Sequence, residues 1–91
     1  MSLDEKQIQK KLDDLSMEWS VVGTVLEKDI KTKNFKESLT LAKKIAKIAE
    51  KMNHHPKLTV EWGQLCVEIT THEVNALTDK DFKFAKAVDK I

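Results

Sequence analysis

The chain has three histidines, and all of them fall in its second half, at positions 54, 55 and 72. Imidazole has a reference pKa of about 6.5, so a histidine can donate or accept a proton near neutral pH. His54 and His55 lie where a long helical pattern must end before Pro56, and the partial negative charge of a helix C-terminus favours a protonated ring. These positions indicate general acid–base chemistry.

Two carboxylates stand at spacings that could bring them to these histidines. Glu50 precedes His54 by one helical turn and could form a hydrogen bond with it. Asp81 falls near a predicted helix start, where an ionised carboxylate is stabilised. Because Pro56 forces an extended backbone on the preceding residue, the rings of His54 and His55 should address two sides of one site.

His72 closes the last predicted strand and continues the polar face of Cys66, Glu68 and Thr70. It should therefore lie on the sheet surface away from the helices, or at its rim. Periodicity alone does not decide whether His72 meets the other two histidines.

Each of these residues also has a structural explanation. His54 fits a helix C-cap, His55 a linker and His72 a solvated strand end. The carboxylate of Asp81 completes a capping box, and Trp62 fits the core of a hairpin.

Other catalytic templates are absent from the sequence. The two glycines, Gly23 and Gly63, cannot form a glycine-rich phosphate loop. Cys66 is the one cysteine, which excludes an internal disulfide and a thiolate zinc cluster, and its mid-strand position favours a half-buried structural thiol.

Hydrophobic periodicity predicts the order α-β-β-α-β-β-α, an α+β fold with helices on one face of a four-stranded antiparallel sheet. A capping box at Ser2 and Glu5 opens a first helix that reaches about Leu15. Asn34 opens the clearest helix. The predicted strands are 15–21, 25–32 (a possible edge strand) and a hairpin of 58–62 and 65–71. The helix opened by Asn34 covers 35–52, and a capping box at 78 and 81 opens a last helix.

Composition limits the partners and the location of the protein. Ninety-one residues form one domain, 1–91, with a thin core that oligomerisation would extend. A net charge of +1 with interleaved signs is not the pattern of a nucleic-acid binder. No segment resembles a signal peptide or a membrane span, so we expect a cytoplasmic protein without membrane contact.

The segment 49–56, Ala-Glu-Lys-Met-Asn-His-His-Pro, resembles the signature of the pterin-4a-carbinolamine dehydratases. Trp62, Thr71-His72, Leu77-Thr78 and Asp81 follow at the family's spacing, and Asn34-Phe35 stands where the family usually has Asp-Phe. The similarity runs from about Trp19 to Ile91 and is densest between Glu50 and Asp81.

The resemblance implies the same α+β fold and the conversion of 4a-hydroxytetrahydropterins to quinonoid dihydropterins. It implies no metal or organic cofactor. His54, His55 and His72 would surround the 4a carbon as catalytic groups, and Glu50 and Asp81 would orient their rings. Pro56 and Trp62 would complete the substrate pocket, with Trp62 as a wall. Family members are dimers or tetramers, so we expect a homodimer or homotetramer.

Two departures from the family concern the pocket. Asn75-Ala76 replaces a pair of small residues, often glycines, and Asn tolerates the left-handed backbone that such a turn needs. Leu58 stands where many members have tryptophan.

Three other functions compete with dehydration of the usual pterin. Three histidines could bind zinc with one open position, although adjacent histidines diverge. The fold could serve as a non-catalytic interaction module, as animal members that bind a homeodomain transcription factor do. A different pterin, such as one related to molybdopterin, could be the substrate.

Overall fold

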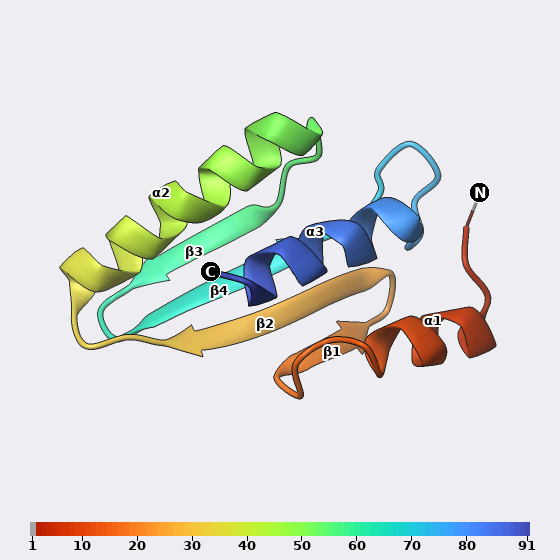
Figure 1. Ribbon diagram of the computed structural model, residues 1–91, viewed down its shortest axis with the longest axis horizontal. Helices are drawn as coiled ribbons and strands as arrows, with labels where there is room; N and C mark the ends of the chain where they lie inside the picture. The colour runs from red at the N-terminus through yellow and green to blue at the C-terminus, as the bar shows by residue number, and fades with distance from the viewer. Residues whose placement is uncertain (1) are drawn as a thin grey trace.

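The computed structural model describes residues 2–91, which form helices on one face of an antiparallel sheet (Figure 1). The strands stand in the order β1-β2-β4-β3, so β1 and β3 are the edges. This arrangement confirms the predicted α+β fold. In chain order the elements are α1 (Glu5–Leu12), β1 (Trp19–Val22), β2 (Val25–Lys31), α2 (Phe35–Met52), β3 (Lys57–Glu61), β4 (Gln64–Ile69) and α3 (Asp79–Asp89).

The core lies between the helices and one face of the sheet. In β4 alternate residues are buried, because successive side chains of a strand point to opposite faces. Leu65, Val67 and Ile69 point toward the helices, and the fully buried Phe84 of α3 packs with them. Cys66 and Glu68 therefore belong to the open, polar face.

The strand β2 is not an edge strand, contrary to the prediction from its polar sequence. It pairs with β1 on one side and β4 on the other. Its polar inward residue, Lys28, is stabilised by an ion pair of 3.0 Å with Asp89 and stacks over Trp19, with Nζ 5.6 Å from the ring centroid. The local pattern contains no trace of these distant partners.

The N-terminal elements are shorter than predicted. The residue that caps α1 is Asp4 and not Ser2, and it forms a capping box with Gln7. The helix ends at Leu12 and not at Leu15. β1 begins at Trp19, because Ser16 turns the chain by bonding to Asp89 and leaves Met17 almost fully exposed. The alternating apolar residues Leu15 and Met17 therefore do not belong to a strand, contrary to the prediction.

Three local signals position the segments that carry the histidines. α2 ends at Asn53, whose φ of 51° is left-handed. Asn75, with a φ of 52°, makes the turn that the sequence predicted there, and a bridge between Thr71 and Ala76 closes it. The capping box of Thr78 and Asp81 opens α3 as predicted.

No helix within residues 2–91 combines the length and the apolar content needed to cross a bilayer.

Candidate active site

His54 forms a buried hydrogen bond with Asp81. Its Nε2 lies 2.6 Å from Oδ1 of Asp81, whose side chain is completely inaccessible to solvent. The bond connects the residue after the left-handed cap of α2 to the first turn of α3. The end of α2 and the loop before α3 therefore meet at one end of the sheet (Figure 1).

The second carboxylate oxygen of Asp81 also accepts hydrogen bonds. Oδ2 accepts a hydrogen bond of 2.8 Å from the Thr71 hydroxyl and one of 2.9 Å from the backbone N–H of Thr78. The Thr71 and Thr78 hydroxyls lie 2.8 Å apart. We call Asp81, His54, Thr71 and Thr78 the Asp81 network. A buried carboxylate is stable only with such partners, and here they tie three chain segments together.

Glu50 binds His55 and not His54. Its Oε2 lies 2.5 Å from Nε2 of His55, and both side chains are largely exposed. The hydrogen bond to His54 that the helical spacing suggested does not form, because the left-handed Asn53 turns the chain and the ring of His54 points to Asp81. Each of the two adjacent imidazoles thus has its own carboxylate.

His55 and His72 line the same small cavity, on the open face of the sheet where β4 ends. The cavity has a volume of about 140 Å³. Its lining residues are Val25, His55, Lys57, Glu68, Ile69, Thr70 and His72. His54 and Asp81, which are both buried, are not among them. The structure therefore divides the predicted site into an exposed pair of imidazoles and a buried support.

Trp62, expected as a wall of the pocket, is not among the residues that line this cavity. It lies in the turn between β3 and β4, and it is 75% exposed. The length of β3 separates this turn from His55. Because it is exposed, Trp62 is not a hairpin core residue either. Leu58 faces the helices and packs against the core, so its difference from the family does not alter the cavity lining.

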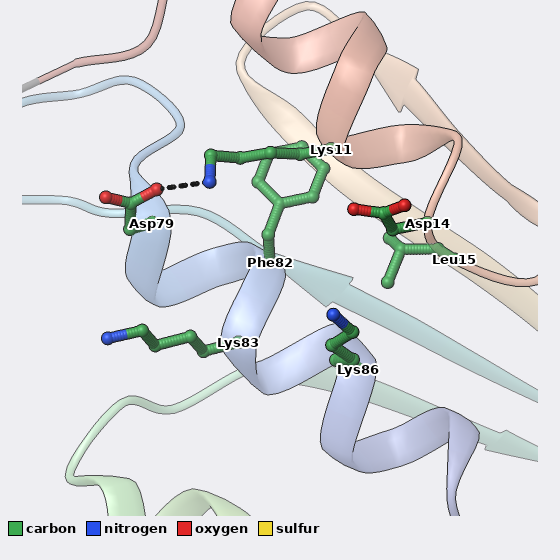
Figure 2. Close-up of a pocket in the computed structure, with 7 residues that line it drawn as sticks. All are labelled: Lys11, Asp14, Leu15, Asp79, Phe82, Lys83 and Lys86. Atoms are coloured by element: carbon green, nitrogen blue, oxygen red, sulfur yellow. Dashed lines mark ion pairs between the residues drawn. The ribbon is translucent and has the colours of Figure 1, made fainter.

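A larger hollow between α1 and α3 contains none of the predicted site residues (Figure 2). It has a volume of about 310 Å³, with Leu15 and Phe82 beside three lysines and two aspartates. Two of these residues, Lys11 and Asp79, already form an ion pair of 2.8 Å. Volume alone therefore does not identify the site.

The thiol of Cys66 has the character of a structural group. Burial, followed by the hydrogen bond and charge of Asp29 and the charges of Glu68 and Glu27, raises its pKa to about 12. At neutral pH the thiol is protonated and a poor nucleophile. Within residues 2–91 no three His, Cys, Asp or Glu side chains are arranged to hold a metal ion.

The sequence reasoning missed two contributions to the site. Thr71, which binds Asp81, was noted only as a neighbour of His72 at the family's spacing and was not predicted to bind a site residue. Glu68 and Lys57 line the cavity as cross-strand neighbours. Glu68 was recognisable, because it shares the polar face of β4 with His72 by simple alternation.

The chain is similar to a known protein family along its whole length. The family described as "Pterin 4 alpha carbinolamine dehydratase" matches residues 1–91. A protein of Sulfolobus acidocaldarius that carries the family's name is 41% identical over 91 residues, covering 100% of this chain and 99% of its own. One from Rickettsia canadensis is 44% identical over 89 residues, covering 96% of this chain and 81% of its own.

A solved structure from Brucella melitensis, titled transcriptional coactivator/pterin dehydratase, superposes with a TM-score of 0.92. The two chains are 26% identical, and the match covers 99% of this chain and 97% of that one. Sequence and structure thus agree along the whole chain. The chain belongs to the pterin-4a-carbinolamine dehydratase family.

Proposed function

We propose that the protein dehydrates 4a-hydroxytetrahydropterins to quinonoid dihydropterins. The observation that carries the proposal is that His55 and His72, which come from separate loops, line one cavity. Membership of the family supplies the class of substrate.

The reaction needs one proton donor and one proton acceptor near the 4a carbon. A protonated imidazole gives its proton to the 4a-hydroxyl group, the C–O bond breaks, and the group leaves as water. The ring N–H next to that carbon loses its proton to a neutral imidazole, and its electron pair forms the C=N bond of the product. His55 and His72 are suited to these two roles because an imidazole can either donate or accept a proton through its ring nitrogens.

In this proposal His54 positions the site and does not touch the substrate. Its Nε2 is engaged by Asp81, and its side chain is 10% exposed. The Asp81 network instead binds His54 and Thr71, and so it fixes the backbone next to His55 and His72. Glu50 orients the ring of His55, and Pro56 keeps its backbone extended.

The test is stopped-flow absorbance of 4a-hydroxytetrahydropterin dehydration by the wild type and by His55→Ala, His72→Ala and the double variant. Each single substitution should lower kcat/KM by roughly 10²–10⁴, the range typical of a lost acid or base. Lys51→Ala is the matched control, because Lys51 is an exposed residue next to Glu50 outside the cavity. Its activity should equal that of the wild type.

Circular dichroism and thermal melting establish that each variant is folded. A folded double variant with full activity would exclude this cavity as the active site. A wild type that binds pterin without turning over this substrate would indicate another pterin substrate. A wild type that shows no turnover and no pterin binding would favour the interaction-module alternative.

A further inference from the structure

Glu68 is the one carboxylate among the residues that line the His55–His72 cavity. Its side chain is 28% exposed, and its ion pair with Nζ of Lys57 is long, at 4.0 Å. Within residues 2–91 no hydrogen bond to this carboxylate accompanies that pair. An ionised carboxylate has about four acceptor positions, so Glu68 has free capacity toward the cavity.

The hydroxyl group of Thr70, which follows β4 and lines the cavity, is already engaged. Thr70 donates its hydroxyl hydrogen to the backbone carbonyl of Thr24 at 2.6 Å. Lys57, by contrast with Glu68, is a donor and has no acceptor atoms. Among these groups Glu68 is therefore the strong acceptor for a ligand that carries N–H groups.

The place of Glu68 in the sheet is unfavourable for the protein alone. Its cross-strand partner in β2 is Glu27, and like charges directly opposite each other destabilise a sheet. The negative charges of Glu68 and Glu27 also help to raise the pKa of the nearby Cys66 thiol. A ligand that donates hydrogen bonds to Glu68 would relieve this repulsion.

We infer that Glu68 binds the pyrimidine edge of the pterin ring and determines specificity for it; this inference rests on the proposed function. That edge carries an amino group at C2 and an N–H at N3, two parallel donors in one plane. A carboxylate accepts such a pair with two parallel hydrogen bonds, as it does from arginine. Held by this edge, the ring presents its fused bond, which includes the 4a carbon, toward His55 and His72.

The test compares Glu68→Gln with Glu61→Gln. The Glu68 variant keeps the shape of the side chain but replaces one acceptor with a donor and removes the charge. Its KM for the 4a-hydroxytetrahydropterin should rise roughly tenfold or more, the loss expected for charge-assisted hydrogen bonds, with kcat nearly unchanged. Glu61→Gln is the matched control, an exposed carboxylate on the same face of the sheet that pairs with Gln64 outside the cavity lining, and its KM should not change.

A binding measurement separates this inference from the proposed function. Calorimetry with pterin and with lumazine, which has an oxygen in place of the 2-amino group, should show that the wild type prefers pterin and that Glu68→Gln loses the preference. An active wild type whose pterin preference survives in Glu68→Gln would overturn the inference and leave the function standing. Loss of the preference in a protein that binds pterin without dehydrating its 4a-hydroxy form would support the inference and overturn the function.

Discussion

Asp81 acts on the candidate site entirely through other residues. Its two oxygens accept hydrogen bonds from His54, Thr71 and the backbone of Thr78, all of them buried. Two of these partners directly precede a cavity histidine, His55 or His72. One carboxylate therefore fixes the relative position of two rings that it does not touch.

Replacing Asp81 with alanine should reduce the free energy of unfolding by about 3–5 kcal/mol, because His54 would be left buried without its partner. Glu50→Gln breaks the exposed pair with His55 and should cost no more than about 1 kcal/mol. Urea denaturation at neutral pH measures both values. Equal losses in the two variants would mean that the buried network is not a main source of stability.

At the scale of elements, hydrogen bonds to Asp89 connect the C-terminal end of α3 to β1 and β2. This carboxylate accepts hydrogen bonds from the Ser16 backbone at 2.9 Å, the Trp19 indole at 2.8 Å and the Lys28 ammonium at 3.0 Å. Burial raises the pKa of Asp89, but these three donors outweigh it and leave the pKa below its ordinary value. A group of this kind stabilises the fold in its ionised form.

Asp89→Asn should lower stability at pH 7 by about 1.5–3 kcal/mol, the worth of hydrogen bonds to a charged group. Because the folded-state pKa is depressed, the contribution of Asp89 is complete above the unfolded-state pKa of about 3.9 and is lost as the pH falls through the folded-state value. The gap between variant and wild type should therefore close in acid. Chemical denaturation between pH 7 and pH 2 measures it, with the exposed Asp13→Asn as control. A gap independent of pH would contradict the assignment.

The sequence predicts elements well where the deciding contacts are local. α2 and α3 follow from their caps and helical spacing, and β4 follows from its alternation. The position of β2 inside the sheet did not follow, because it depends on Lys28 meeting Asp89 from the far end of the chain. The histidines and the two carboxylates, Glu50 and Asp81, were identified from the sequence, but the pairing of each carboxylate with its ring was not. Glu50 was one turn from His54, and the left-handed Asn53 redirected that ring to Asp81.

At the scale of the whole molecule, several apolar groups remain outside the core. Phe35 and Leu39 of α2 are 50% and 42% exposed, and Trp62 is 75% exposed. A bond from Thr32 to Gly63 places the turn of Trp62 beside the start of α2. We propose that copies of the chain associate through this end of the molecule.

Light scattering should therefore give the mass of a dimer or tetramer. Phe35→Glu combined with Leu39→Glu should shift the mass toward the monomer, because charges would replace exposed apolar groups at the contact. Lys47→Glu, an exposed change elsewhere on α2, is the control and should leave the mass unchanged. A monomeric wild type would exclude the proposal.

The contrast between the two tryptophans makes the chain its own optical reporter. Trp19 is 4% exposed and its indole N–H is bound to Asp89, whereas Trp62 lies in solvent at the opposite end from the histidines. Fluorescence from Trp19 should shift to longer wavelength when the core melts, and fluorescence from Trp62 should be insensitive to melting but sensitive to anything that covers it. A Trp62→Phe protein and a Trp19→Phe protein, each with one emitter left, would separate unfolding from association in the same cuvette.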